Sequence, residues 1–518
     1  MRTVRDVLFD NPAIDEARTA LVCDDRRQSY GELRVRVRRL MGALHDRGIA
    51  PGMRVAVLAG NGIAFVEIYY AVLSLGAILV PLNYRLTVNE HAALLKDAEP
   101  ALLFAGAAWR DHAAALLGDV PSLGRLIVIG ADDPGPDDPG PAEDYERVVA
   151  GGSDGLQRPA PKPADIATLM YTSGTTSLPK GVQISHANYL ADIENVLASH
   201  REDGRAMDAD NVNLQISPLY HAAAQHAWMH VALGATNVLL VQFDPGRVLD
   251  LIARERVNFL FVVPTMLYEI LDHPRFAATD TGSVETVVYG AAPITGRRLA
   301  EAVAGFGPAM TQAYGLTETT SHAIALPRRE HAAHEGATGR AINNVEVRVV
   351  DADGRETAPD EIGEVLVRGP NVMRGYWRRP EATAEALRDG WLHTGDLARR
   401  DAAGYIHVVD RKKDMIISGG INIFPKEIEE EIAALPGVGE VAVFAMPDEK
   451  WGETVAAAIV PRDGARLDEA ALRDALAERL AGFKRPRRMI FLSALPRNPS
   501  GKILKRELRA RYAKAGST

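Results

Sequence analysis

The sequence has little cysteine and no excess of positive charge. Its 518 residues include one cysteine, Cys23, which excludes an internal disulfide framework and a zinc site built from cysteines, and this cysteine usage fits a reducing cytoplasm. Acidic residues outnumber basic ones by 68 to 59, so the formal net charge is −9. A protein of this charge is not expected to hold nucleic acid through its overall field, and an anionic ligand would need a local cluster of donors.

The sequence also lacks segments typical of secretion or of a membrane span. The N-terminus carries several charges early and has no apolar core of the kind a signal peptide needs. Two stretches without charged side chains, 68–84 and 211–243, are interrupted, the first by Gly76 and Pro81 and the second by many Asn, Gln and His residues. We therefore predict a cytoplasmic protein with no membrane span and no nucleic-acid partner.

Composition and periodicity predict an α/β fold. The chain is 47% hydrophobic and 25% charged, which is ordinary for a globular protein of several domains. Early in the sequence, apolar runs of strand length at 54–59, 77–82 and 101–104 alternate with helical spacing at 63–75, and a capping-box pattern at 87–90 predicts another helix. Strands that alternate with helices indicate a parallel sheet.

The composition changes along the rest of the chain. Pro, Gly and Asp crowd residues 131–165, which we interpret as a surface loop between units. Short β-rich runs fill 345–409 and predict a small β-rich subdomain. The polar string 411–414 then precedes helix and strand signals that make a compact α+β unit of about 100 residues. We place the domain boundary in this string, which divides the chain into 1–411 and 412–518.

The strongest local motif is a loop rich in hydroxyl groups that follows a predicted strand at 167–171. Hydroxyl and backbone N–H groups in such a loop form a concave set of donors that suits polyphosphate, and a nearby lysine adds charge. The order G-x-x-x-x-G-K-[ST] of the common phosphate-binding loop is absent. The motif alone leaves open a Ser/Thr-rich surface loop without function. It consists of Thr172, Ser173, Gly174, Thr175, Thr176, Ser177, Leu178, Pro179 and Lys180.

Six further motifs follow this loop and, together with it, carry a family resemblance. They are Pro-Leu-Tyr-His (218–221), Gly-Ala-Ala-Pro (290–293), Gln-Ala-Tyr-Gly-Leu-Thr-Glu (312–318), Trp-Leu-His-Thr-Gly-Asp (391–396), Asp-Arg (410–411) and Pro-Ser-Gly-Lys (499–502). In this order and spacing the sequence resembles the adenylate-forming superfamily of acyl-CoA synthetases, peptide-synthetase adenylation domains and beetle luciferases, from Tyr30 to Arg506. The resemblance implies a large N-terminal domain of two α/β sheet subdomains plus the small β-rich subdomain, followed by a mobile small α+β C-terminal domain that carries a catalytic lysine.

The chemistry of this superfamily gives the motifs candidate roles. A carboxylate attacks the α-phosphorus of ATP, so two anions must approach, and positioning and electrostatic stabilisation carry the catalysis. By resemblance, Lys502 is the catalytic cation and Glu318 is the carboxylate that holds Mg²⁺. The residues alone also allow a solvated lysine and an exposed acid at a helix start. Thr172 and His221 complete the candidate catalytic set, and His221 would line the acyl site and thiol tunnel.

The resemblance also assigns contacts to ATP. Tyr314 would stack on adenine, Thr317 would bind the α-phosphate, and Asp396 would accept from both ribose hydroxyls, with a further ribose contact from Arg411. The small residues 290–292 would let the base lie against the backbone, although a helix start explains them nearly as well. The candidate nucleotide-binding residues are Ser173, Gly174, Thr175, Thr176, Lys180, Gly290, Ala291, Ala292, Gln312, Tyr314, Gly315, Thr317, Asp396 and Arg411.

A second reaction, with a thiol, is implied by the same resemblance. Lys413 falls at the hinge about which the small domain swings after adenylation. Ser418, Gly419 and Gly420 would then form the loop for the thiol step, where paired glycines let a thin pantetheine arm approach. Coenzyme A is the simplest acceptor, so the implied cofactors are ATP, Mg²⁺ and coenzyme A. A separate carrier protein as acceptor, an enzyme that stops at acyl-AMP, a non-catalytic nucleotide-binding protein and a homodimer stay open.

The segment after the Pro-Leu-Tyr-His motif bears on the substrate. Amino-acid adenylation domains usually place an Asp there to hold the substrate ammonium, but residues 220–231 contain no acid, so we predict a fatty, aromatic or alicyclic acid without an α-amino group. His226 and His230 stand four residues apart and could share a helical face. Without Asp, Glu or Cys nearby, we favour pocket or core histidines over metal ligands, with His322 also available for polar substituents.

Three positions depart from the family pattern. Ser177 replaces the glycine usual in the phosphate loop, Ala291 and Ala292 stand where Gly-Ala or Gly-Gly is common, and Ile421 replaces the more frequent Glu. None of these changes removes a charged group that adenylation needs. We therefore expect them to affect rate and substrate fit more than the class of reaction.

Overall fold

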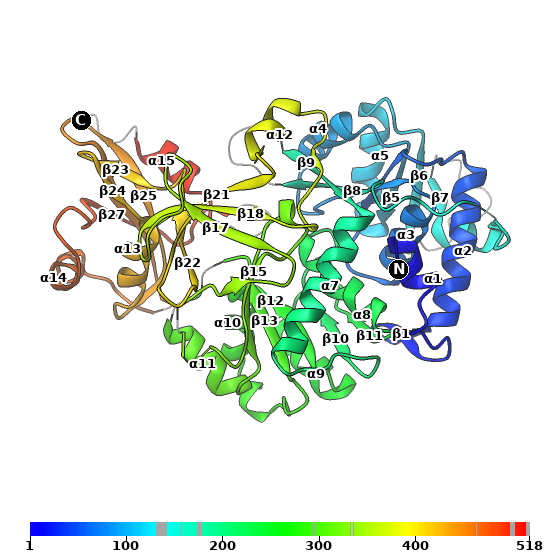
Figure 1. Ribbon diagram of the computed structural model, residues 1–518, viewed down its shortest axis with the longest axis horizontal. Helices are drawn as coiled ribbons and strands as arrows, with labels where there is room; N and C mark the ends of the chain where they lie inside the picture. Colours follow the sequence, from blue (N-terminus) through cyan, green and yellow to red (C-terminus); the bar gives the residue numbers. More distant parts are fainter. Residues whose placement is uncertain are drawn as a thin grey trace. The chain divides into compact units, whose positions relative to one another are not determined.

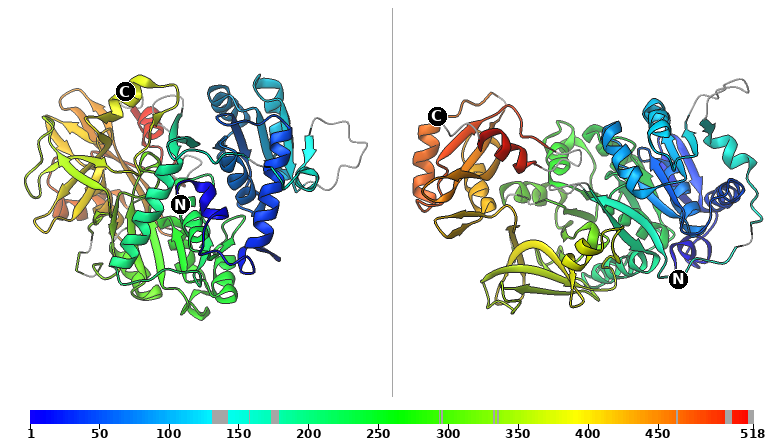
Figure 2. Two further views of the ribbon diagram at one scale, coloured as in Figure 1. Left: turned by 45° about the vertical axis from the view of Figure 1, so that its right-hand side comes forward. Right: turned by 90° about the horizontal axis from the view of Figure 1, so that it is seen from above.

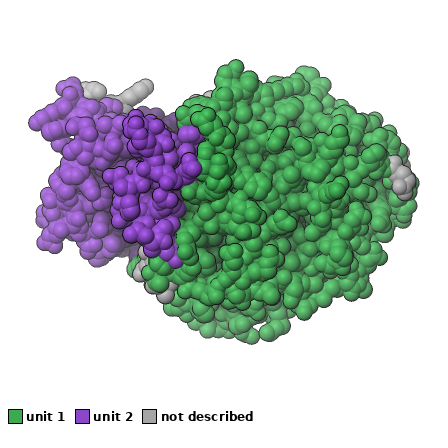
Figure 3. All heavy atoms as spheres, viewed as in Figure 1, with its two compact units in different colours: residues 1–347, 367–392 green, residues 348–366, 393–518 purple. Residues whose placement is uncertain are grey.

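The fold was obtained as a computed structural model (Figure 1). The described residues are 1–130, 142–156, 158–172, 179–292, 294, 296–331, 333–334, 336–462, 464–497 and 503–513. The chain divides into two compact units (Figure 3): unit 1 comprises Met1–Val347 and Val367–Leu392, and unit 2 comprises Arg348–Leu366 and His393–Thr518. The larger and smaller units fit the predicted fold class, while the boundary between 411 and 412 stays a prediction.

The first sheet of unit 1 grows from the alternating apolar runs near the N-terminus. Its strand order is β19-β9-β8-β4-β3-β5-β6-β7, parallel from β8 to β7 and antiparallel at β8, β9 and β19. The strands are β3 (Arg54–Leu58), β4 (Ile78–Pro81), β5 (Leu102–Gly106), β6 (Arg125–Ile129), β7 (Ala142–Asp144), β8 (Ile166–Thr172), β9 (Lys180–Ser185) and β19 (Gly375–Tyr376). The associated helices are α2 (Tyr30–Asp46), α3 (Ile63–Ser74), α4 (Val88–Ala98), α5 (Arg110–Asp119) and α6 (Tyr145–Gly151).

The second sheet of unit 1 has the order β16-β15-β14-β13-β12-β10-β11-β1-β2 and is parallel from β14 to β1. Its strands are β1 (Thr19–Cys23), β2 (Arg26–Ser29), β10 (Val212–Gln215), β11 (Thr236–Leu239), β12 (Phe259–Val262), β13 (Thr286–Gly290), β14 (Met310–Tyr314), β15 (Ile324–Leu326) and β16 (Arg340–Ala341). The helices here are α1 (Val4–Phe9), α7 (His186–Glu202), α8 (Gln225–Ala232), α9 (Pro245–Glu255), α10 (Pro264–Asp272) and α11 (Gly296–Phe306).

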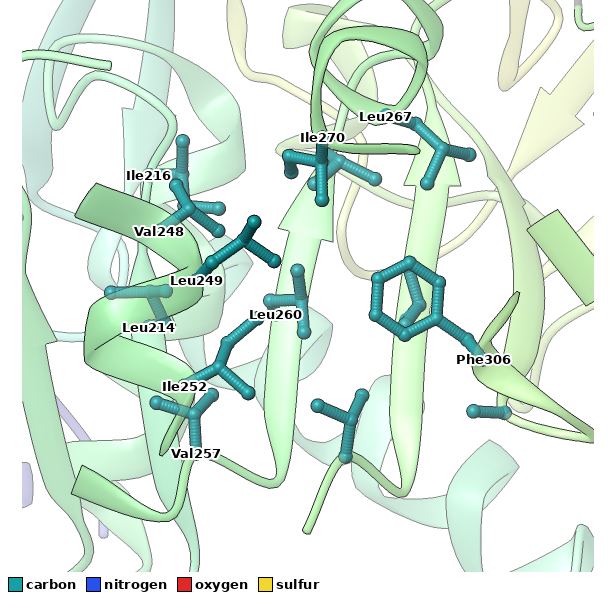
Figure 4. Close-up of a cluster of buried hydrophobic side chains, with 14 of the residues drawn as sticks. Leu214, Ile216, Val248, Leu249, Ile252, Val257, Leu260, Leu267, Ile270 and Phe306 are labelled. Carbon is teal, nitrogen blue, oxygen red and sulfur yellow. The ribbon is translucent and has the colours of Figure 1, made fainter. Parts of the chain in front are cut away.

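The two sheets of unit 1 are layered with helices (Figures 1 and 2). Helices α4 and α5 pack on one face of the first sheet, and α9, α10 and α11 pack on one face of the second (Figure 4). Helices α3, α7 and α8 lie between the sheets, where Tyr69 of α3 stacks on Trp228 of α8 with ring centroids 3.8 Å apart. The neutral segment after Asp210 thus forms interior strands and helix. No helix of the described residues is long and apolar enough to cross a bilayer.

The β-rich runs form a small sheet, as predicted. Its order is β17-β18-β21-β20, and β22 pairs with β21. The division between the units passes through its strands, so β20 belongs to unit 1 and β22 to unit 2. The elements are β17 (Glu346–Val350), β18 (Ile362–Arg368), α12 (Pro380–Ala386), β20 (Leu387–Arg388), β21 (Trp391–Arg400) and β22 (Ile406–Arg411).

The remainder of unit 2 is the predicted α+β unit. Apolar side chains of α13 and α14 cover one face of its sheet, and α15 covers the other. The elements are β23 (Ile416–Ser418), β24 (Ile421–Ile423), α13 (Pro425–Ala433), β25 (Val438–Asp448), β26 (Gly452–Pro461), α14 (Glu469–Arg479), β27 (Arg488–Phe491) and α15 (Lys505–Ala513).

One prediction about organisation was wrong. Residues 142–151, inside the segment interpreted as loop, form β7 and α6. The Asp144 side chain accepts from the backbone N–H of Arg147 and caps α6, while Tyr145, Val148 and Val149 are buried. The prediction failed because the segment follows a run dense in Pro, Gly and Asp, and because the only sequence signal for the start of the short helix α6 is Asp144.

Candidate active site

Neighbouring parallel strands bring two of the predicted motifs together in unit 1. Strand β13 ends at Gly290 and β14 ends at Tyr314, with Gly290 opposite Ala313. The carboxyl ends of parallel strands meet at one sheet edge, which is where open α/β sheets bind ligands. A Cβ at position 290 would lie 2.3 Å from the carbonyl oxygen of Ala313, so only glycine fits there. Gln312, earlier on β14, accepts a hydrogen bond of 3.1 Å from the Tyr289 hydroxyl.

Two small residues at this edge have clear backbone reasons. A Cβ at Gly315 would lie 1.8 Å from the carbonyl oxygen of Ser321, so a side chain is excluded there. Ala291 has φ of 65°, a left-handed conformation that costs a residue with a Cβ about 1–2 kcal/mol. Both Ala291 and Ala292 are exposed. The departure noted at Ala291 is therefore a strained position, and the strain explains why glycine suits it.

Glu318 is held from two sides. It lies in a short 3₁₀ turn, Thr317–Thr319, and is half-buried, unlike the exposed acid that its sequence position also allowed. Its Oε1 accepts a hydrogen bond of 2.8 Å from the Tyr376 hydroxyl, and its carbonyl oxygen accepts one of 2.8 Å from the N–H of Met373. A fixed carboxylate oxygen is the hard donor that Mg²⁺ prefers.

Glu318 offers a single carboxylate, which fits a cation that is shared with phosphate. Among the described residues, no group of three or more His, Cys, Asp or Glu side chains is arranged to hold a metal ion. Mg²⁺ is commonly bound by one or two carboxylates plus substrate phosphates and water. One fixed carboxylate, that of Glu318, is thus the kind of ligand that a magnesium ion bound to a polyphosphate uses.

The two described ends of the hydroxyl-rich loop lie opposite each other. Thr172 ends β8, Lys180 begins β9, and the two residues pair across the hairpin. The Lys180 ammonium lies 4.7 Å from the centroid of the Tyr376 ring, a cation–π contact worth about 0.5–1 kcal/mol when exposed. Ser173, Gly174, Thr175, Thr176 and Ser177 lie outside the described residues. Lys180 and Glu318 therefore both contact Tyr376, Lys180 through the ring and Glu318 through the hydroxyl.

His221 faces a small cavity between the sheets. The cavity measures about 10 Å³, room for about one water molecule, and aromatic and aliphatic side chains form most of its wall. Its lining includes His221, Tyr69, Met170, Tyr189, Leu219 and Trp228. The residues of the Pro-Leu-Tyr-His motif and of α8 therefore meet α3 and β8 at a mainly apolar surface.

A second set of histidines is packed on aromatic rings, and we call it the His226 cluster (His226, His230, His322, Phe259 and Phe261). The His226 ring lies on Phe261 with centroids 5.0 Å apart and 4.9 Å from His322. Neither ring nitrogen of His226 has a hydrogen-bond partner. Burial lowers the pKa of His226 well below its usual value and that of His230 to about 4, so both rings are neutral.

The His226 cluster agrees in part with the sequence. His226 and His230 share one face of α8, as predicted, and His230 Nδ1 lies 2.7 Å from the carbonyl oxygen of His226. His322 Nδ1 lies 3.2 Å from a carboxylate oxygen of the buried Asp192. Sequence reasoning missed Asp192, whose only signal is a charge among the apolar positions of helix α7. These histidines offer polar groups inside an otherwise apolar interior.

Unit 2 holds the predicted ribose residues as a pair. Asp396 on β21 lies opposite Arg411 on β22, and Arg411 Nε is 3.0 Å from a carboxylate oxygen of Asp396. Asp396 is buried, whereas the Arg411 side chain is 41% exposed. Lys413 follows on an exposed turn, so the candidate hinge residue lies two positions beyond this pair.

The predicted thiol-step loop is a tight hairpin. Ser418 pairs with Ile421, and the two residues between them, Gly419 and Gly420, have φ of 58° and 81°. A Cβ at Gly419 would also lie 2.6 Å from the ring of Trp451. The paired glycines are thus required by the turn itself. Lys502 lies outside the described residues, and its role stays a prediction.

Family models match both parts of the chain. Residues 8–377 match the AMP-binding enzyme family, and residues 427–502 match the AMP-binding enzyme C-terminal domain. The chain belongs to the AMP-binding enzyme family, which confirms the predicted superfamily of adenylate-forming enzymes.

Individual relatives cover nearly the whole chain. A feruloyl-CoA synthase of Amycolatopsis sp is 41% identical over 486 residues, which are 93% of this chain and 94% of the relative. An indoleacetate–CoA ligase of Aromatoleum aromaticum is 35% identical over 504 residues, 97% of this chain and 96% of the relative. ATP-bound MatB from Rhodopseudomonas palustris, a solved structure, has a TM-score of 0.89 with 34% identity and 99% coverage of both chains. The predicted fold class is confirmed.

Proposed function

We propose that the protein is an ATP-dependent carboxylate–CoA ligase that forms an acyl-AMP before the thioester. The observation that carries this proposal is the placement of Glu318 and Lys180 on one tyrosine in unit 1 of an AMP-binding enzyme. In the first half-reaction the acid's carboxylate attacks the α-phosphorus of ATP and pyrophosphate leaves. In the second, a thiol displaces AMP from the acyl-adenylate.

The roles proposed for individual residues follow the charges that these steps require. Glu318 would hold Mg²⁺, which neutralises phosphate charge when it is bound. Lys180 would attract the polyphosphate, and Asp396 would bind the ribose after exchanging its contact with Arg411. Lys502 would place a positive charge between the two reacting anions in the first step.

The substrate that we propose is an aromatic acid without an α-amino group. Tyr69, Tyr189 and Trp228 lie with His221 around a cavity that holds about one water molecule as it stands, and flat apolar side chains around a site that widens there would favour an aryl group. No acidic residue occurs in 220–231 to pair with an ammonium group, and an unpaired charge in such surroundings is costly. Both named relatives that are CoA synthetases or ligases have aromatic acids in their names.

The test is pyrophosphate release with ATP and Mg²⁺ across a panel of aryl, fatty and alicyclic acids, with coenzyme A or a purified carrier protein as the thiol. We expect the largest turnover with aryl acids and coenzyme A. Turnover only with fatty acids would contradict the substrate proposal, and thioester formation with the carrier protein alone would contradict the acceptor.

The two half-reactions can be separated with one variant. Lys502→Ala should lower adenylation by about a thousandfold or more, because a cation between the reacting anions is removed, while it spares thioester formation from supplied acyl-AMP. Lys505→Ala is the matched control, since Lys505 is engaged with Glu429 at 2.8 Å. Equal loss of both steps in Lys502→Ala would refute the proposed role of Lys502.

A further inference from the structure

Tyr376 lies on an edge strand that is pinned beside the hydroxyl-rich loop. In β19, Gly375 pairs with Gln183 and Tyr376 pairs with Val182 of β9, the strand that Lys180 begins. The backbone N–H of Trp377 donates to the carbonyl oxygen of Gly181 at 2.8 Å. The position of the Tyr376 side chain is therefore set by the same ladder that sets Lys180.

The Tyr376 side chain touches two charged groups that the proposed function uses. Its hydroxyl donates to Glu318 Oε1 at 2.8 Å, and its ring lies 4.7 Å from the Lys180 ammonium. The residue is 9% exposed. Burial, and then the charge of Glu318, raises the pKa of the Tyr376 phenol far above its usual value, so the hydroxyl stays a donor.

The segment that carries Tyr376 and the segment that carries Glu318 are also joined by contacts that do not involve the tyrosine hydroxyl. The Asn371 side-chain amide donates to the carbonyl oxygens of Thr319 and His322 at 3.1 and 2.6 Å, and the Thr320 hydroxyl donates to the carbonyl oxygen of Asn371 at 2.6 Å. Because these contacts persist without the tyrosine hydroxyl, its removal should free the Glu318 carboxylate without separating the two segments.

We propose that Tyr376 is a positioning residue that holds the Glu318 carboxylate and the Lys180 ammonium in one fixed arrangement for a metal-bound polyphosphate. The inference rests on the proposed function only in taking ATP and a divalent cation as ligands. The hydroxyl selects one orientation of the carboxylate, and the ring keeps the ammonium beside it. Binding then requires less ordering of these two side chains.

Tyr376→Phe tests the hydroxyl while it keeps the ring. The readout is binding of Mn²⁺ with a nonhydrolysable ATP analogue, followed by the electron paramagnetic resonance signal of free Mn²⁺. We expect the affinity for Mn²⁺ to fall about tenfold, since a hydrogen bond to a charged group is removed. Tyr145→Phe is the matched control, because the buried Tyr145 hydroxyl donates to Glu67 Oε2 at 2.6 Å elsewhere in unit 1. This control should leave Mn²⁺ affinity unchanged.

A double-mutant cycle tests whether Tyr376 acts through Glu318. In a Glu318→Ala background, Tyr376→Phe should change Mn²⁺ affinity by less than about twofold, since the hydrogen-bond partner is already lost. Unchanged affinity in Tyr376→Phe, an equal loss in Tyr145→Phe, or additive effects in the cycle would each overturn the inference. Native protein that binds Mn²⁺ with the analogue but makes no acyl-AMP from any acid would instead refute the proposed function and leave this inference standing.

Discussion

Two buried side chains of unit 1, Glu67 and His226, have opposite surroundings, since the first has several hydrogen-bond partners and the second has none. The first belongs to the Glu67 cluster (Glu67, Gln28, Arg36 and Tyr145). Glu67 on helix α3 is completely buried, and its carboxylate accepts hydrogen bonds from Arg36 at 2.6 and 3.1 Å, from Gln28 at 2.7 Å and from Tyr145 at 2.6 Å. Three side chains from different parts of the sequence thus compensate one buried charge.

The His226 cluster shows the contrary case. His226 is 1% exposed, and the Phe259 and Phe261 rings and His322 surround it, yet neither of its nitrogens has a hydrogen-bond partner. A buried polar group without a partner costs about 1–3 kcal/mol. Removing one partner from the Glu67 cluster should therefore destabilise the fold, whereas the polar atoms of His226 already oppose folding. The comparison predicts that the first cluster responds to mutation through stability and the second through recognition.

The largest expected effect is on the Glu67 cluster. Glu67→Ala should lower the free energy of unfolding by about 3–5 kcal/mol, because Gln28 and Tyr145 lose a buried acceptor and the half-buried Arg36 keeps only Glu146. Urea denaturation measures the change. The control is Asp353→Ala, which breaks an ion pair with Arg355 whose side chains are 70% and 77% exposed. A similar loss in both variants would remove the distinction on which the comparison rests.

Acidification should act through the neutral buried histidines. Burial lowers the pKa of His200 to about 3 and that of His230 to about 4, against 6.5 in the unfolded chain. Between pH 6.5 and 4 the unfolded state therefore binds more protons, so stability is full above pH 6.5 and falls as the pH decreases, by about 1.4 kcal/mol per pH unit for each histidine.

Denaturant midpoints measured from pH 7 to 4.5 check this dependence. In His226→Leu the slope of stability against pH should be smaller than in the native protein by one histidine's share, because the pKa of His226 is also lowered by burial. An unchanged slope would mean that His226 binds protons equally in the folded and unfolded states, so that burial does not lower its pKa.

The two clusters also show what the sequence could predict. Apolar periodicity predicted β3, β4, β5 and β8 of the first sheet. The pattern at 87–90 predicted the start of α4, where Thr87 accepts from Glu90 N–H as expected. The pairing of His226 and His230 on one helical face followed from their spacing. These features depend on residues close together in the chain, so local pattern is enough.

Partners that are distant in the chain were beyond this reasoning. Tyr376 meets Glu318 across 58 positions and Asp192 meets His322 across 130, and nothing in either local sequence indicates the partner. The glycines at 419 and 420 were interpreted through pantetheine access, but the structure adds the hairpin geometry that requires them. Sequence motifs thus pointed to individual residues. The contacts that hold those residues in place involve partners distant in the chain and are visible only in the structure.

A smaller effect is expected for a single hydroxyl of the Glu67 cluster. Tyr145→Phe should cost about 1.5 kcal/mol of unfolding free energy, since Glu67 keeps Arg36 and Gln28 but loses one donor. Tyr70→Phe is the matched control, because the Tyr70 hydroxyl is buried in the same unit without a partner. That variant should lose nothing or gain stability. If Tyr70→Phe proved the more costly of the two, hydrogen bonding would not explain the stability of the cluster.

The smallest effect on stability is expected at His226. His226→Leu replaces unpartnered nitrogens with an apolar group of similar size, so the unfolding free energy at pH 7 should change by less than about 1 kcal/mol or rise. Recognition should change more. If the ring serves a polar substituent of the acid, the preference for 4-hydroxycinnamate over cinnamate, measured as a ratio of kcat/KM, should fall about tenfold, while His226→Gln keeps more of it because the amide retains a donor. A large loss of stability with an unaltered ratio of kcat/KM values would contradict this prediction. It would mean that His226, like Glu67, is needed for the stability of the fold.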